Sequence, residues 1–327
     1  MEIMEVKQRS EEILKALGEV FVSDSTVLRR LVCAALANGH VLFEDYPGLG
    51  KTLLAKTFAR IIGCAWGRVQ FTPDLVPADI IGTRIWRPKT SEFTLEKGPI
   101  FTNVLLADEI NRSPPKTQSA LLEAMEERQV TIEGTSYSLG RPFFVIATQN
   151  PIEQEGTFPL PEAQMDRFML RMTTGYVRTL KEESEILRRR IRWMADDPVD
   201  VIRPVIDQAR MVQMQDVVER AIYVDEHILD YVSEIVRATR SHPAVEVGSS
   251  PRGALALLKC SRANATISGR DFVTPDDVKS FAHDTLAHRI ILKMEYEIDS
   301  DVTQARVVEE VLKGIETPKE YSRRVQG

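Results

Sequence analysis

A short glycine-bearing stretch carries the residue types that hold phosphate groups. It follows the apolar run 41–43 and precedes apolar residues spaced as on one face of a helix. A strand, a turn and a helix N-terminus in that order place backbone N–H groups around an anion, and the helix dipole adds to the attraction. We expect this phosphate loop to comprise Asp45, Tyr46, Pro47, Gly48, Leu49, Gly50, Lys51, Thr52 and Leu53.

Two side chains of the phosphate loop have predicted chemical roles. Lys51 reaches the β- and γ-phosphates of a nucleotide, and the Thr52 hydroxyl ligates Mg²⁺, as in the pattern G-x-x-x-x-G-K-S/T. Asp45 occupies the place of the first glycine. We expect the loop to form nevertheless, because Asp tolerates left-handed backbone angles better than most residues. By itself the stretch is also compatible with a purely structural turn.

Two adjacent carboxylates end a second apolar run. Residues 104–107 lead into Asp108 and Glu109, as expected of a buried parallel strand whose C-terminal end opens into an active site. We predict that Asp108 holds Mg²⁺, usually through water, and that Glu109 polarises the attacking water as a general base. The alternative is a core strand followed by a solvated acidic turn. The phosphate loop upstream favours the catalytic interpretation, and with it the binding and hydrolysis of ATP.

The elements that must position these residues change character along the chain. Strands are predicted at 41–43, 68–71, 104–107 and 143–148. They alternate with helices, which indicates an α/β fold with a parallel sheet covered on both faces. Helical periodicity with almost no strand signal follows at 180–194, 204–214, 226–241 and 252–267. We therefore expect an α/β nucleotide-binding domain at 1–178 and an all-helical domain at 179–327.

Smaller signals add detail to this division. Ser250 and Thr274, each followed by proline, are predicted N-caps of two helices. Alternating residues around polar turns at 83–95 and 129–139 predict two hairpin inserts, which commonly serve as working surfaces on a rigid scaffold. The basic run 188–192 is interpreted as a solvated helix face in preference to a binding patch.

Composition narrows the class of protein. The 327 residues are 43% hydrophobic and 28% charged, as in ordinary globular chains, and the net charge of −6 argues against a dedicated duplex-binding surface. No apolar run approaches the ~20 residues that span a membrane, and the N-terminus lacks a signal-peptide pattern. The three cysteines are isolated in apolar surroundings, as reduced thiols are. We expect a cytoplasmic protein that has no nucleic-acid partner.

Several long segments resemble the MoxR family of AAA+ ATPases. They are GHVLFEDYPGLGKT, LLADEINRSPPKTQSALLEAMEERQVT, FFVIATQNPIEQEGTFPLPEAQMDRF, GSSPRGALALLK and SGRDFVTPDDV, in family order over nearly the whole chain. The resemblance implies an AAA+ P-loop core with a helical lid domain, and an aspartate at the place of Asp45 is familiar in that family. The hairpins then correspond to the helix-2 insert and the pre-sensor-1 hairpin of its clade. That clade also includes magnesium-chelatase subunits, minichromosome-maintenance helicases and dynein.

The resemblance implies three further roles. Asn150 resembles the sensor-1 residue that orients the attacking water, although a strand-end Asn is otherwise a turn residue. Arg167 resembles the arginine finger given to a neighbouring subunit; the alternative is an intramolecular pair with Asp166 or Glu162. Arg252 resembles sensor 2, unless it contacts only solvent. Residues 22–25 depart from the Val-Gly-Gln that relatives carry near the adenine, so the base contacts stay open.

For function, the resemblance implies an ATP-hydrolysing, chaperone-like motor that uses ATP and Mg²⁺ and assembles as a ring, expected to be a hexamer. Alternatives are a nucleic-acid motor, a chelatase-subunit ATPase, or a switch that hydrolyses too slowly to act as a motor. The expected partner is a protein with a von Willebrand factor A domain, with a client awaiting its metal or cofactor. Trp86 and Phe93 of the first hairpin are its expected contact, unless both rings are buried in the insert's own core.

Overall fold

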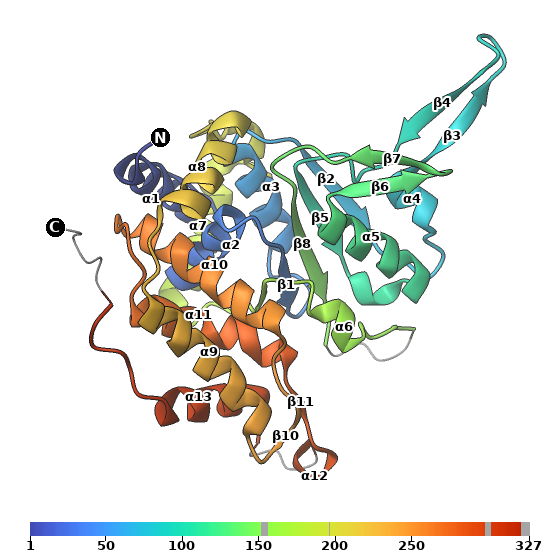
Figure 1. Ribbon diagram of the computed structural model, residues 1–327. Coiled ribbons are helices and arrows are strands. Elements are labelled where there is room, and N and C mark those ends of the chain that lie inside the picture. Colours follow the sequence, from blue (N-terminus) through green and yellow to red (C-terminus); the bar gives the residue numbers. More distant parts are fainter. Residues whose placement is uncertain (152–155, 196, 298–301, 322–327) are drawn as a thin grey trace.

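A parallel sheet of five strands forms the centre of the molecule (Figure 1). The computed structural model describes residues 1–151, 156–195, 197–297 and 302–321. The strand order is β2-β5-β8-β1-β9, with every neighbouring pair parallel. The strands are β1 (Val41–Glu44), β2 (Trp66–Gln70), β5 (Val104–Asp108), β8 (Phe144–Gln149) and β9 (Leu170–Met172). The four predicted strands are confirmed to within a residue or two, whereas β9 is too short to show a periodicity in the sequence.

Helices make up most of the remaining described chain. The first six are α1 (Ile3–Val20), α2 (Ser25–Leu36), α3 (Lys51–Ile61), α4 (Pro77–Ile81), α5 (Pro115–Glu127) and α6 (Glu162–Met165). The C-terminal half adds α7 (Leu180–Trp193), α8 (Gln208–Ala221), α9 (Glu226–Ser241), α10 (Pro251–Ile267), α11 (Pro275–Leu286), α12 (Met294–Glu297) and α13 (Gln304–Gly314). Short 3₁₀ turns are η1 (Ile110–Arg112), η2 (Val199–Val201) and η3 (Ala287–Arg289).

Alternate residues of the central strands enter two different hydrophobic cores. Phe43 and Leu106 belong to a core shared with α1, α2 and α3, whereas Leu42 and Leu105 belong to a second core with α4 and α5. Burial on both faces explains why these strands read as continuous apolar runs. It also leaves the strand ends as the place where polar side chains meet solvent, which is where the predicted site lies.

The C-terminal half is helical, as predicted, with two differences. Helix α8 begins at Gln208, later than the predicted 204, because the Asp207 carboxylate accepts the N–H of Arg210 and fixes the first turn there. A short antiparallel ladder, β10 (Val245–Val247) with β11 (Ile291–Leu292), lies among these helices. The core around α1 and α2 continues into α9, α10 and α11, so the domain boundary at 178/179 stays a prediction.

The two predicted caps behave differently. Thr274 forms a capping box with Asp277, as its spacing predicts. Ser250 precedes α10 but does not cap it through its side chain. Its hydroxyl lies 3.1 and 3.3 Å from the two carboxylate oxygens of Asp166 instead. Ser250 therefore occupies the predicted N-cap position before Pro251, but a tertiary acceptor takes the hydroxyl that would cap the helix.

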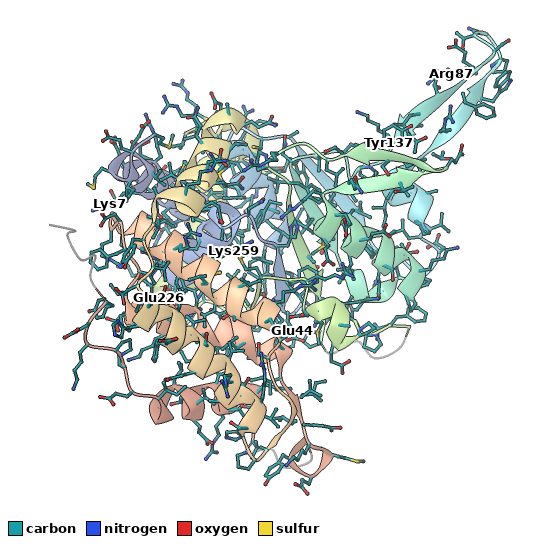
Figure 2. The ribbon with its side chains drawn as sticks, in the orientation of Figure 1. Lys7, Glu44, Arg87, Tyr137, Glu226 and Lys259 are labelled. Atoms are coloured by element: carbon teal, nitrogen blue, oxygen red, sulfur yellow. The ribbon has the colours of Figure 1, made fainter. Side chains whose placement is uncertain are left out.

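Two hairpins extend from the α/β half. They are β3 (Gly82–Arg87) with β4 (Glu92–Lys97), and β6 (Gln129–Ile132) with β7 (Thr135–Ser138). The first projects away from the body, with Arg87 near its far end and Tyr137 of β7 nearer the body (Figures 1 and 2). Glu133 and Gly134 both have positive φ, as a tight two-residue hairpin turn requires.

The first hairpin has aromatic side chains that face solvent. Trp86 and Phe93 are cross-strand partners with ring centroids 5.1 Å apart, and they are 47% and 56% exposed. The alternative that both rings are buried in the insert's own core is therefore wrong. Across the described part of the chain, no helix is long and apolar enough to span a membrane.

Candidate functional site

The phosphate loop joins the end of β1 to the start of α3. Gly48 and Gly50 have φ of +82° and +74°, a region that L side chains rarely adopt. A side chain at Gly48 would meet open space, so at this position backbone conformation is what requires glycine. At Gly50, a Cβ would also lie 3.0 Å from the ring of Phe21. The loop therefore turns sharply into the N-terminus of α3, where backbone N–H groups have no partner within the helix.

Asp45 supports this loop in a way that the sequence does not indicate. The loop is present as expected, but it does not use the tolerance of Asp for left-handed angles, since Asp45 is not among the described residues with positive φ. Its buried carboxylate accepts hydrogen bonds from the N–H and hydroxyl of Thr174, at 2.7 and 2.9 Å, and from the N–H of Gly175 at 3.2 Å. Asp45 thus ties the loop to the chain that follows β9.

Lys51 places a cation next to the carboxylates of the site. Its Nζ donates to the backbone carbonyls of Asp45 and Tyr46, at 3.2 and 2.8 Å. Burial lowers the pKa of Lys51, while the carboxylates of Asp45, Asp108 and Glu109 oppose that shift. Three neighbouring negative charges therefore favour the ammonium form.

The two carboxylates at the end of β5 are held by Thr148 of β8. The buried Thr148 hydroxyl donates to Asp108 Oδ1 at 2.7 Å and accepts the N–H of Glu109 at 2.8 Å. Glu109 has φ of +57°, an uncommon conformation for a non-glycine residue. A single hydroxyl thus fixes both the metal-binding and the general-base candidates, and the sequence gives no sign of it beyond a polar residue near a strand end.

Residues of β2 and η1 contact the same carboxylates from the other side. Arg68 lies 2.7 Å from Asp108 Oδ2, and Gln70 donates to Glu109 Oε2 at 2.7 Å. Arg112 lies 3.2 Å from the same Glu109 oxygen. Strand β2 is the sheet neighbour of β5, in register with Gln70 opposite Asp108. These contacts follow from strand order, which the sequence alone leaves undetermined.

A single cavity of about 400 Å³ collects the predicted phosphate site. The phosphate loop, both carboxylates and Thr148 line it, together with Gln149 and the mostly buried Asn150. Tyr46 is the loop residue that does not line this cavity. Its exposed ring stacks on that of Tyr176, with the ring centroids 5.9 Å apart. The backbone carbonyl of Asn150 accepts the Asn111 amide at 3.3 Å, which fixes the chain at the end of β8. An open-sided glycine turn, a lysine, a hydroxyl and a carboxylate around one cavity fit a triphosphate and a hard, oxygen-bound cation.

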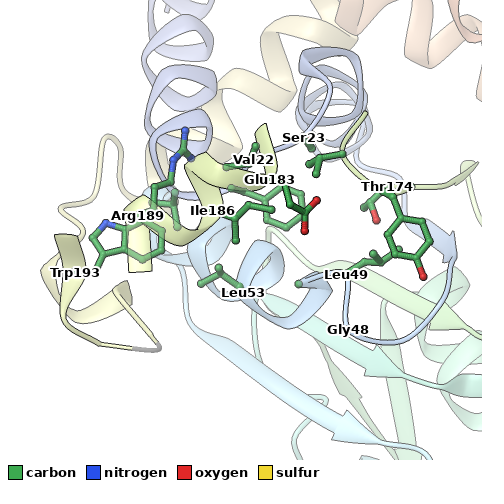
Figure 3. Close-up of a pocket in the computed structure, with 16 residues that line it drawn as sticks. Val22, Ser23, Gly48, Leu49, Leu53, Thr174, Glu183, Ile186, Arg189 and Trp193 are labelled. Atoms are coloured by element: carbon green, nitrogen blue, oxygen red, sulfur yellow. The ribbon is translucent and has the colours of Figure 1, made fainter. Parts of the chain in front are cut away.

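An adjoining, more apolar pocket of about 320 Å³ lies on the other side of the loop (Figure 3). It shares Gly48, Leu49, Gly50 and Leu53 with the phosphate cavity. Its remaining walls come from the α1–α2 connection, the chain after β9 and α7, with Val22, Ser23, Thr174, Ile186, Arg189 and Trp193 among the lining residues. Figure 3 shows the α7 side chains above the loop residues. A flat, largely apolar base fits here, beside the loop that faces the phosphates.

The arginines of the basic run on α7 differ in their contacts and exposure. Arg189 turns inward, where its Nη1 donates to the carbonyl of Gly18 at 2.8 Å and its Nε lies 3.2 Å from Glu185. Arg188 and Arg192 are exposed and lie near the same glutamate. Arg189 thus joins α7 to the end of α1 beside the apolar pocket, while its neighbours form the expected solvated face.

Arg167 and Arg252 lie together outside the phosphate cavity. Each pairs with a different carboxylate oxygen of Glu126, which is on α5. Arg167 thus pairs within its own chain, as the alternative interpretation expected, but its partner is Glu126 and not Asp166 or Glu162. Both arginines line a separate cavity of about 450 Å³, so neither reaches the phosphate loop of its own chain.

Asp166 and Arg289 anchor this region. The nearly fully buried Arg289 lies 2.6 Å from Asp166 Oδ1 and also donates to the backbone carbonyl of Phe168 at 2.6 Å. Arg252 approaches Asp166 more loosely, at 3.8 Å. We call Glu126, Asp166, Arg167, Arg252 and Arg289 the arginine cluster. It joins α5 and the chain after α6 to α10 and η3.

Comparisons with known proteins agree with this architecture. The ATPase family associated with various cellular activities (AAA) matches residues 40–170, and the AAA lid domain matches residues 237–311. The protein YeaC of Bacillus subtilis is 44% identical, over 94% of this chain and 94% of its own length. Chaperone MoxR1 of Mycobacterium tuberculosis is 40% identical, over 94% of this chain and 82% of its own length.

A third relative and a solved structure add to the comparison. Protein MoxR of Methylorubrum extorquens is 30% identical over 92% of both chains. A crystal structure of a protein from Cytophaga hutchinsonii has a TM-score of 0.89 and 38% identity, over 97% of both chains. The similarity therefore extends over the sheet, the site and the helical half together. The chain belongs to the MoxR family of AAA+ ATPases.

Proposed function

We propose that this protein binds ATP with Mg²⁺ and hydrolyses it to ADP and phosphate. The observation that carries the proposal is the single cavity lined by the phosphate loop, Asp108, Glu109 and Asn150. The apolar pocket across the loop supports the nucleoside half of the ligand. The position of Val22 and Ser23 in that pocket makes them adenine-contact candidates, despite their departure from the family sequence.

The roles of the residues follow from their placement. Backbone N–H groups of the loop and the Lys51 ammonium bind the phosphate oxygens. Thr52 and Asp108 would hold Mg²⁺, and the bound ion would neutralise part of the negative charge on the phosphates. Glu109 accepts a proton from the water that attacks the γ-phosphorus, and Asn150 orients that water.

The position of the arginines supports a ring. Arg167 and Arg252 do not line the phosphate cavity of their own chain, yet a transferring phosphoryl group needs cations around it. A neighbouring copy supplies both residues in our proposal, with ATP between subunits of a hexamer. Arg252 thus acts with Arg167 on the neighbour's nucleotide.

The biological role in this proposal is remodelling of other proteins in the cytoplasm. A relative named chaperone MoxR1 supports the class of activity. The partner is a protein with a von Willebrand factor A domain that recruits a client awaiting its metal or cofactor. The exposed Trp86 and Phe93 on the projecting hairpin support docking there, since clustered aromatic side chains are frequent interface anchors.

Mixing two inactive variants tests the shared site. The Arg167→Ala subunit keeps an intact phosphate pocket, and the Lys51→Ala subunit keeps an intact Arg167. Mixed rings therefore contain some interfaces at which an intact pocket faces an intact Arg167. Each variant alone should lose ATPase activity, by roughly 10³–10⁵ for a finger supplied in trans, and the mixture should regain part of it. Mixing Lys51→Ala with Glu109→Gln is the matched control, because every pocket is then defective. If mixed rings form but activity does not return, Arg167 does not act on a neighbour.

A further inference from the structure

One carboxylate holds both arginines that the proposed function assigns to the neighbouring subunit. Glu126 Oε2 accepts from Arg167, and Glu126 Oε1 accepts from Arg252. The side chains of Arg167, Arg252 and Glu126 are 30%, 42% and 35% exposed. They lie at the protein surface, within reach of a ligand brought by another copy.

The two guanidinium groups need this carboxylate in order to lie side by side. Burial first, and then the like charge of Arg252, lower the pKa of Arg167, whereas the nearby Glu123 raises it. With Glu126 between them, two positive charges are offset by one negative charge, and each has a charge-assisted hydrogen bond. One nitrogen of each guanidinium group, Nη1 of Arg167 and Nη2 of Arg252, is therefore engaged with Glu126 within its own chain.

We propose that Glu126 is a latch that competes with the neighbouring subunit's nucleotide for Arg167 and Arg252. The inference rests on the proposed ring and deepens it by giving the ATP-dependent contact a competitor within each subunit. A γ-phosphate offers several anionic oxygens and displaces the single carboxylate. ADP has no γ-phosphate, so both arginines stay with Glu126 and the interface lacks their contacts. Breaking the two ion pairs costs free energy only when the γ-phosphate takes the arginines, so Glu126 weakens association in ATP and leaves association in ADP nearly unchanged.

A purely structural role for Glu126 is the competing explanation. Glu126 lies on α5 and Arg252 on α10, so the pair also joins the α/β half to the helical half. That connection is already made by the buried Arg289 with Asp166, and Ser250 adds a hydrogen bond to the same carboxylate. Loss of a structural contact would weaken folding and assembly together, whereas loss of a latch strengthens assembly in ATP.

Glu126→Gln distinguishes the two roles, because it keeps size and hydrogen bonding and removes only the charge. The protein concentration for half-assembly is measured by mass photometry in ADP, and in ATP with both chains also carrying Glu109→Gln to prevent turnover. We expect Glu126→Gln to lower the ATP value roughly three- to tenfold, since exposed ion pairs are worth little more than that. The ADP value should change less than twofold, and the melting temperature should fall by no more than about 4 °C. Glu127→Gln removes the same charge one position along α5 and should alter neither value.

The outcomes separate the latch from the ring. A wider ratio of the ADP value to the ATP value in Glu126→Gln supports the latch. An unchanged or narrower ratio in a chain that assembles normally with ATP overturns the latch and leaves the ring standing. If the chain with an intact Glu126 does not assemble in ATP at all, the ring fails and the latch fails with it.

Discussion

The phosphate pocket and the arginine cluster are both charged sites, but they are built in opposite ways. The pocket comes from one continuous loop and the adjacent ends of parallel strands, and its carboxylates surround a cavity with Lys51. The cluster gathers residues from α5, the chain after α6, α10 and η3, and its cations are already paired with carboxylates of the same chain. The pocket is thus ready for a ligand, whereas in the cluster a ligand must compete with an existing ion pair.

The largest effect that would sharpen this comparison is expected at Glu109. Glu109→Gln keeps the size of the side chain but removes the general base, so turnover should fall by about 10²–10⁴. ATP binding should persist, because the loop and Lys51 are intact. Steady-state ATPase rates and binding of a fluorescent ATP analogue measure the two quantities.

Arg252→Ala is the companion variant from the cluster. Subunits that carry an intact Arg252 should restore the activity of neighbouring Arg252→Ala pockets in mixed rings, whereas no neighbour can restore a Glu109→Gln pocket. Near-normal hydrolysis by Glu109→Gln would remove Glu109 from the catalytic role.

A smaller effect is expected when Thr148 is changed to Val. The substitution preserves shape but removes the hydroxyl that bridges Asp108 and the Glu109 N–H. Leaving these groups without that partner should lower the free energy of unfolding by about 1–3 kcal/mol. It should also lower kcat about tenfold, because a rise of about 1.4 kcal/mol in the activation barrier slows a reaction tenfold. Thermal unfolding and ATPase kinetics measure both effects, and Thr148→Ser, which keeps the hydroxyl, should recover most of the loss. Unaltered kcat in Thr148→Val would mean that the strand ends alone position the carboxylates.

The smallest effect on ATP turnover is expected outside both sites. Changing Trp86 and Phe93 to Ser removes the exposed ring pair of the projecting hairpin, which lines neither the phosphate cavity nor the apolar pocket. Basal ATPase activity should change less than about twofold, since exposed positions away from special features rarely matter, while capture of the partner protein from native cells should weaken. Unchanged capture of every partner would place docking elsewhere. Absence of any von Willebrand factor A protein among the partners would contradict the partner itself.

Much of the molecule could be predicted because its signals are local. The Gly48 and Gly50 turn, the hairpins and the Thr274 capping box each depend on residues only a few positions apart. The four central strands were recognisable because burial on both faces forces continuous apolar runs. The residues at the ends of those strands followed, because parallel strands bring their carboxyl ends to one edge.

Other features depended on contacts between segments distant in sequence. The carboxylate of Asp45 reaches Thr174, the Ser250 hydroxyl contacts Asp166 in place of its own helix, and Glu126 bridges two arginines from different elements. No periodicity or motif encodes such pairings, because a side chain's partner is set by which elements pack together. The sequence by itself therefore determined the chemistry available to this protein. The tertiary structure alone decided which charges meet within the chain and which face another molecule, because ion pairs depend on distances that only packing fixes.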